Sequence, residues 1–114
     1  MSDTIFHKII RREIPAEIVY EDDDVLAFRD INGQAPTHVL FIPRKAVATL
    51  NDLEEADALL IGKLVLAATA YAKAQGFAEK GYRCVINCNE DGGQSVYHLH
   101  LHLLAGRRLS WPPG

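Results

Sequence analysis

Histidine and leucine alternate strictly in one stretch of the 114-residue chain, which reads HLHLHLL over residues 98–104. Successive side chains of a β-strand point to opposite faces, so His98, His100 and His102 fall on one face and the intervening leucines on the other. The stretch therefore predicts a strand over residues 96–104 with one apolar face toward a core. Histidine is a poor choice for mere solubility, and three imidazoles on the other face indicate a chemical site.

Length and composition limit what the chain can be. A chain of 114 residues is predicted to form a single domain, residues 1–114, that buries a core without needing disulfides or a metal. A net charge of −3 argues against a nucleic-acid polymer as ligand. Lys63 and Lys73 interrupt the longest apolar segment, so we expect no membrane span. Cys84 and Cys88 are too few for a disulfide framework, and reduced thiols predict a cytoplasmic protein.

Periodicity predicts an α+β fold with a five-stranded antiparallel sheet, one long helix and a short N-terminal helix. Asp3 and Thr4, with Ser2, are good N-cap residues for the short helix, which closes before Pro15. An apolar stripe from residue 52 to 75 marks the long helix, with Gly76 as its stop. The strands are predicted at 16–20, 25–29, 37–42, 82–87 and 96–104, with a loop at 30–36, a turn at 89–94 and a tail at 109–114.

A metal site is one interpretation of the histidine face. Two histidines at i and i+2 of a strand can reach one ion, and His102, His38, Asp30 or Cys88 could complete the ligand set. The sequence lacks the HExxH and CxxC spacings. Three ligands from positions 98–102 also suit a single ion poorly, so we predict no metal.

Nucleophilic catalysis is the favoured interpretation. Neutral imidazole is a strong nucleophile near pH 7, and attack by His100 on phosphorus would divide one difficult displacement into two easier ones. Three neighbouring imidazoles titrate as a coupled set, so at least one stays neutral. A protonated neighbour would stabilise phosphate charge.

A glycine-containing turn, Asp91-Gly92-Gly93-Gln94-Ser95, immediately precedes the histidine stretch. Glycines let backbone amides approach an anion closely, and Ser95 could donate to a phosphate oxygen or a leaving group. The same residues could form only a hairpin turn. They could also serve a module that binds a nucleotide without reacting with it.

The run from His98 to Leu104 resembles the histidine-triad motif, His-φ-His-φ-His-φ-φ with φ apolar. Four further segments resemble the histidine triad nucleotide-binding proteins, the Hint branch of the histidine triad (HIT) superfamily. They are Asp3–Phe6, Gln34–His38, Asp91–His98 and Trp111–Gly114, so that the resemblance covers nearly the whole chain. The resemblance implies a homodimer whose two sheets join into one of ten strands. It also implies hydrolysis of purine nucleoside phosphoramidates and aminoacyl-adenylates.

The same resemblance implies roles for individual residues. His100 would take up the nucleoside monophosphate as a nucleotidyl-histidine that water then cleaves. His98 and His102 would contact phosphate or orient His100, His38 would join their proton network, and Ser95 would lie near the leaving nitrogen. The implied nucleotide-binding residues are Ile5, Phe6, Ile9, Phe28, Asp30, Ile31, Asn87, Gly93, Gln94, Ser95, His100, His102 and Trp111.

Within that set, Asp30 would accept the ribose hydroxyls, Asn87 and the Gly93 loop would bind phosphate, and Trp111 would reach the partner chain's site. Without the resemblance, the five apolar pocket residues would be assigned to the core. His7 matches no position of the triad motif and is predicted to be a surface residue.

The alternative functions are a diadenosine polyphosphate hydrolase, a nucleotide-binding regulatory module and, more remotely, a zinc hydrolase. The leaving amine and the choice of adenine or guanine are left open.

Overall fold

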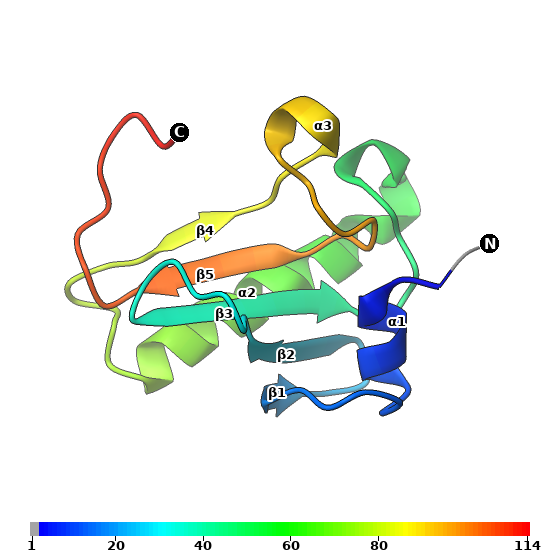
Figure 1. Cartoon of the computed structure of the whole chain (residues 1–114), viewed down its shortest axis with the longest axis horizontal. Coiled ribbons are helices and arrows are strands. Elements are labelled where there is room, and N and C mark those ends of the chain that lie inside the picture. The colour runs from blue at the N-terminus through cyan, green and yellow to red at the C-terminus, as the bar shows by residue number, and fades with distance from the viewer. Residues whose placement is uncertain (1–2) are drawn as a thin grey trace.

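The computed structural model describes residues 3–114, and its central feature is one antiparallel sheet in the order β1-β2-β3-β5-β4 (Figure 1). The short helix α1 precedes the sheet and the long helix α2 lies between β3 and β4. The elements are α1 Ile5–Ile10, β1 Ile18–Glu21, β2 Val25–Arg29, β3 Thr37–Pro43, α2 Ala58–Ala74, β4 Arg83–Val85, α3 Asn89–Gly92 and β5 Leu101–Ala105. This arrangement confirms the predicted fold class.

The sheet is covered on both faces, which explains why β2 and β3 are buried at every position but their first or last. One face packs on α2. Its core joins alternate residues of β2, β3 and the histidine stretch to the helix, among them Val39, Leu101 and Leu64. The opposite face packs on α1 through a second core: Phe6, Ile9, Leu26, Phe28, Leu40 and Ile42. Leu99, Leu101 and Leu103 thus face α2, as expected, and the histidines share the α1 face.

The long helix starts later than its apolar stripe predicts. Two short 3₁₀ turns, Leu50–Asp52 and Glu55–Asp57, occupy the place of its first turns. The Asp52 carboxylate accepts hydrogen bonds from the backbone N–H and the hydroxyl of Thr49, and Asp57 accepts one from the Glu54 N–H. Each aspartate therefore closes a local turn, and α2 begins only at Ala58. Its predicted end is confirmed, because α2 stops at Ala74 and Gly76 has a φ of +85°.

The last strand is also shorter than predicted. β5 begins at Leu101, so His98 and His100 precede the strand instead of lying in it. Phe41 pairs with Leu101, and continuing that register would bring Leu99 opposite Pro43. Proline has no N–H to donate and β3 ends there, so the ladder stops. Side chains still alternate across residues 98–101: Leu99 lies in the α2 core and His98 on the opposite face.

The two ends of the described chain differ in structure: one leads into a helix, and the other is a tail without helix or strand. Asp3 and Thr4 lead into α1, whereas Ser2 lies outside the described residues. At the other end, residues 109–114 contain no helix or strand, and the Arg83 guanidinium donates a hydrogen bond to the carbonyl of Ser110. None of the helices within residues 3–114 has the length and apolar character needed to cross a bilayer.

Candidate active site

The histidine stretch lies where the sheet meets α1, and backbone carbonyls fix the proton positions of two of its rings. The Nδ1–H of His100 donates to the carbonyl oxygen of His98 over 2.8 Å. The Nε2–H of His98 donates to the carbonyl oxygen of Pro43 over 2.7 Å. A neutral imidazole carries one proton, so Nε2 of His100 keeps a free lone pair. That nitrogen is the nucleophilic atom of the ring.

A second pair of rings joins β3 to β5. The Gln34 N–H donates to Nδ1 of His38 over 3.0 Å, so the proton of the neutral ring is on Nε2. That Nε2–H donates a hydrogen bond to Nδ1 of His102, with 2.9 Å between the two nitrogen atoms. The Asp30 carboxylate lies 3.5 Å from the same Nε2 atom of His38. The His102 ring is 4.9 Å from the His100 ring between centroids, so a chain of polar groups runs from Asp30 toward His100.

Burial keeps this cluster neutral. Removal from water lowers the pKa values of His98, His100 and His38 below 6.5, and only partly offsetting effects come from carbonyl bonds or from Asp30. The pKa of His102 falls to about 4 because burial acts together with the neighbouring His100 and His38 rings. Near pH 7 the four rings are therefore uncharged, the state that a nucleophilic imidazole requires.

Asp30, His38 and His102 also place one donor atom each within 4.8 Å of one another, a spacing that a metal could bridge. The Gln34 N–H, however, holds the proton of His38 on Nε2, the nitrogen that faces the other two groups. A metal ligand nitrogen must be unprotonated. Direct hydrogen bonding between His38 and His102 thus fits a proton relay better than a metal cage.

A cavity of about 210 Å³ opens beside His100 and His102. This volume is below the roughly 300–1,000 Å³ of sites that enclose a whole drug-sized ligand, which suits a compact ring with its remainder outside. The predicted residues that line it come from α1, the end of β2 and the loop after it, the segment before β5 and β5 itself. They are Ile5, Phe6, Ile9, Phe28, Asp30, Ile31, Ser95, His100 and His102.

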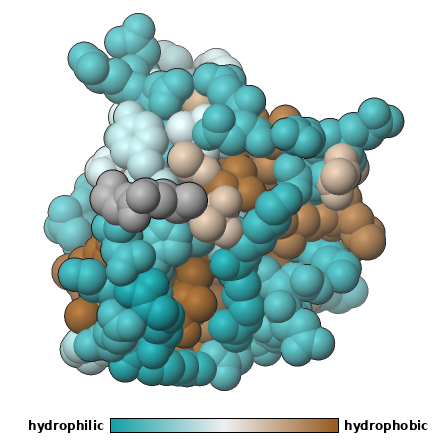
Figure 2. Space-filling model, turned by 90° about the vertical axis from the view of Figure 1, so that its right-hand side faces the viewer, coloured by the Kyte–Doolittle hydropathy of each residue, from teal (hydrophilic) through white to brown (hydrophobic). Residues whose placement is uncertain are grey.

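Burial divides the apolar lining into a floor and a rim. Phe6, Ile9 and Phe28 are buried, and the Phe6 ring meets the Phe28 ring edge-on at 5.3 Å and the His100 ring at 5.0 Å. Ile5 and Ile31 are exposed at the mouth. On the side of the molecule that carries α1, Figure 2 shows apolar residues as separate areas between hydrophilic ones. The predicted pocket residues therefore include both core and surface positions.

Four other predicted nucleotide-binding residues lie outside this lining. Gln94 is buried, and its amide is engaged by the Asn89 N–H and by the carbonyls of Ala48 and Val96. Gly93 has a φ of +81° at the end of α3, a conformation that favours glycine. Asn87 lies against Gly92 at the base of the same loop.

The fourth, Trp111, is 81% exposed in the C-terminal tail. Two further predicted site residues, His98 and His38, do not line the cavity either, but each is hydrogen-bonded to a residue that does, His100 and His102 respectively.

The cavity also contains residues that the sequence did not single out. Ile14, Pro15 and Ala16 follow α1 and form one wall, and Leu40 and Val96 form another. Leu40 could have been found, because it lies two residues after His38 on the same strand and so on the same face. The wall after α1 has no periodic signal, since it belongs to no helix or strand.

Comparisons with known proteins agree with this geometry. Residues 11–109 match the family model of the HIT domain. The chain is 53% identical to the purine nucleoside phosphoramidase of Escherichia coli strain K12 over 94% of this chain and 90% of that protein. It is 58% identical to an uncharacterised HIT-like protein of Synechococcus elongatus over 98% of this chain and 97% of that one.

Solved structures show the same fold. The crystal structure of a HIT family hydrolase from Legionella pneumophila matches with a TM-score of 0.96 and 53% identity, over 98% of this chain and all of that chain. A histidine triad protein from Clostridium difficile matches with a TM-score of 0.92 and 44% identity, over 96% of both chains. Fold and site thus define a histidine-triad protein. This chain belongs to the HIT family, which confirms the predicted superfamily, while the Hint branch stays a prediction.

Proposed function

We propose that this protein hydrolyses purine nucleoside phosphoramidates through a nucleotidyl intermediate on His100. The observation that carries the proposal is the tautomer of His100: its Nδ1–H is bound to the His98 carbonyl, so Nε2 is available to attack beside the apolar cavity. The similarity to the Escherichia coli purine nucleoside phosphoramidase, at 53% identity, supports the same reaction here.

The proposed reaction has two steps. First, Nε2 of His100 forms a bond to phosphorus, the P–N bond breaks, and the amine leaves with a proton supplied by a neighbouring group. Ser95 lines the cavity and is the candidate group near the leaving nitrogen. Then water attacks phosphorus, the P–Nε2 bond breaks, the nucleoside monophosphate departs, and the proton that the water loses restores the group that protonated the amine. The His38–His102 pair supplies a path for the proton that this water releases.

The cavity supports a nucleoside as the ligand. A purine would lie against the buried rings of Phe6 and Phe28, and ribose hydroxyls would donate to Asp30 at the rim. Asn87 and the loop that contains Gly93 and Gln94 lie outside the cavity lining and would bind the phosphate group. The Trp111 side chain is exposed, which agrees with the proposal that it contacts a partner chain.

We also propose that two copies pair through β4. This strand is one of the two outer strands of the sheet, and an outer strand offers unpaired N–H and C=O groups to another strand. Pairing of two β4 strands would give the predicted ten-stranded sheet. Sedimentation equilibrium at micromolar concentration should give twice the mass of the 12.7 kDa chain, and a monomer would contradict the dimer. A cytoplasmic location stays a prediction that rests on the two cysteines.

The deciding experiment is steady-state hydrolysis of adenosine 5'-phosphoramidate by the wild type and by His100→Ala, with a chelator present. The wild type should release AMP, and the variant should lose at least about 1,000-fold in kcat, a loss of the size seen when a nucleophile is removed. AMP binding by the variant, measured by calorimetry, shows that the pocket is intact.

Other outcomes have definite meanings. Normal turnover by His100→Ala contradicts the mechanism, and activity that the chelator abolishes indicates a metal enzyme. Faster cleavage of diadenosine polyphosphate than of the phosphoramidate indicates a diadenosine polyphosphate hydrolase. Tight AMP binding with no hydrolysis of either indicates a regulatory module.

A further inference from the structure

His7, which the sequence predicted to be a surface residue, also packs against the histidine stretch. It is half-buried in the first turn of α1, and its ring meets the ring of His98 edge-on, with centroids 4.9 Å apart and planes at 79°. His7 does not line the cavity beside His100. With His98 it lines a separate cavity of about 600 Å³, whose lining also includes Lys45 and Val47. His7 therefore contacts the triad without contacting the proposed nucleotide site.

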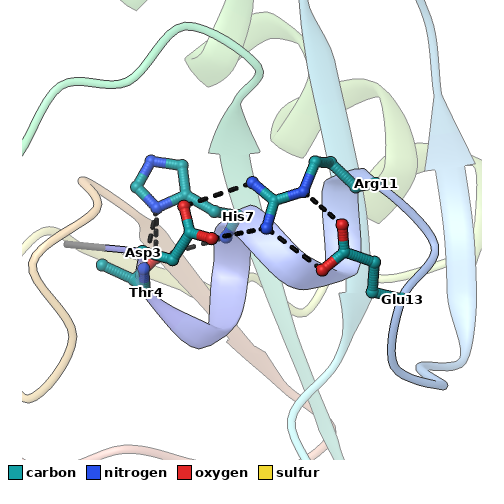
Figure 3. A network of polar contacts seen from close by, with 5 residues as sticks. All are labelled: Asp3, Thr4, His7, Arg11 and Glu13. Atoms are coloured by element: carbon teal, nitrogen blue, oxygen red, sulfur yellow. Dashed lines mark hydrogen bonds and ion pairs between the residues drawn. The ribbon is translucent and has the colours of Figure 1, made fainter. Parts of the chain in front are cut away.

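The position of the His7 ring is fixed by the start of α1 (Figure 3). The Thr4 N–H donates to Nδ1 of His7 over 2.9 Å, and the His7 N–H donates to Oγ1 of Thr4 over 3.2 Å. This is a capping box in which an imidazole takes the place usually held by Glu or Gln. Beside it, the Arg11 guanidinium bridges the carboxylates of Asp3 and Glu13. The ring is thus held by bonds that belong to the helix cap.

His98, by contrast, lies in a segment with little backbone support. Residues 95–100 belong to no strand, and Leu99 makes a backbone hydrogen bond to Val47 instead of to the sheet. The His98 ring is anchored by its bond to the Pro43 carbonyl and by edge-on contacts with His7 and Phe6. Its Nδ1 atom is buried and has no hydrogen-bond partner among the described residues. Ring packing therefore supplies much of what holds this residue in place.

His98 in turn sets the state of the proposed nucleophile, because its carbonyl oxygen accepts the Nδ1–H of His100. A displacement of His98 moves this acceptor and lets the His100 ring change tautomer or orientation. We propose that His7 is a positioning residue of the active site: the edge-on packing of its ring holds His98 so that the His98 carbonyl keeps Nε2 of His100 unprotonated and aimed at phosphorus. This inference rests on the proposed function.

Two substitutions distinguish the effect of the His7 ring packing from the effect of its capping hydrogen bond. His7→Gln keeps a side-chain acceptor suited to the capping box but removes the ring. His7→Phe keeps an aromatic ring but removes the acceptor. Lys8→Ala, at the next and exposed position of α1, is the matched control. All variants are compared with the wild type in full-length protein, for thermal unfolding and for hydrolysis of adenosine 5'-phosphoramidate.

The proposal expects opposite effects of the two substitutions. His7→Gln should retain the wild-type melting temperature and lose roughly tenfold in kcat with little change in KM, a loss typical of a slightly misplaced catalytic group. His7→Phe should melt at a lower temperature but keep kcat close to the wild type at temperatures where it is folded. Full kcat in His7→Gln overturns the proposal. So does a loss of kcat in folded His7→Phe as large as in His7→Gln, since the capping bond would then be responsible.

A spectroscopic measurement makes the test independent of turnover. The ¹⁵N chemical shifts of the His100 ring report which nitrogen carries the proton. The wild type and His7→Phe should show the proton on Nδ1, and His7→Gln should show exchange between the two nitrogens. An unchanged His100 spectrum in His7→Gln overturns the inference. If the wild type has no phosphoramidase activity, the proposed function fails, whereas the spectra still decide whether His7 controls His100.

Discussion

The Nδ1 atom of His100 lies 2.8 Å from the backbone carbonyl oxygen of His98, two residues earlier in the chain. A carbonyl oxygen can only accept, so this contact alone assigns the ring proton to Nδ1. The next histidine, His102, receives its hydrogen bond from His38 on β3. Neighbouring histidines of one motif thus have their protons fixed by different parts of the fold.

The pH dependence of hydrolysis should reflect the buried state of His100. Burial lowers its pKa below 6.5, and the hydrogen bond to the His98 carbonyl and the charge of Asp30 only partly offset this. The active form is the neutral one, so kcat/KM should stay level as the pH falls to 6.5 and decline only below it. A profile from about pH 4.5 to 8, corrected for hydrolysis without enzyme, gives the midpoint of the acid limb. A midpoint at or above 6.5 would contradict the burial argument.

Folding stability should also fall in mildly acidic solution. The pKa of His102 is about 4 in the folded protein, against an ordinary value of 6.5. Between these values the unfolded chain binds a proton that the folded chain does not, so stability is greatest above 6.5 and decreases as the pH falls toward 4. The aspartates with lowered pKa values, such as Asp57, lose their contribution to stability only near and below their ordinary pKa of 3.8.

Urea unfolding at several pH values between these limits measures the acid effect. The midpoint should decrease steadily with falling pH in the wild type. His102→Asn, which cannot take up that proton, should show a shallower decrease. Equal slopes in the two proteins would show that His102 titrates normally in the folded state.

Asp30→Asn should weaken discrimination for ribose. The Asp30 carboxylate lines the cavity and accepts a hydrogen bond from the Asn32 N–H over 2.8 Å, which fixes its orientation. Hydrogen bonds to a charged group contribute about 1.5–3 kcal/mol, so the wild type should bind AMP at least about tenfold more tightly than 2',3'-dideoxy-AMP. Calorimetry should show most of this preference lost in Asp30→Asn and retained in Asp23→Asn, a control in the exposed β1–β2 turn. An unchanged preference in Asp30→Asn would place the ribose elsewhere.

Gln94→Ala should destabilise the protein more than an ordinary surface substitution. The Gln94 side chain is buried and connects the Asn89 N–H with the carbonyls of Ala48 and Val96. Its removal leaves these groups without partners, and we expect a loss of about 2–3 kcal/mol in the free energy of unfolding. Gln75→Ala, at an exposed position after α2, is the control and should change it by less than about 0.5 kcal/mol. Equal urea midpoints for the two variants would contradict this structural role.

Features that depend on short-range pattern were predictable from the amino-acid sequence alone. Alternation in residues 98–104 separated the imidazole face from the leucine face, and this held even though β5 begins only at Leu101. The apolar stripe ending at Gly76 located the end of α2, because a left-handed glycine stops a helix whatever surrounds it. The motifs also identified most of the cavity lining in advance.

Features that depend on contacts between distant segments became known only from the folded chain. Pro43 ends the ladder and its carbonyl oxygen accepts a hydrogen bond from His98, and the Gln34 N–H fixes the proton of His38 on Nε2. His7 meets His98 across 91 positions of sequence, a contact that no local pattern encodes. Ring protons and ring packing follow from which carbonyls, amides and rings the fold brings within about 3–5 Å, so they are known only once the chain is folded.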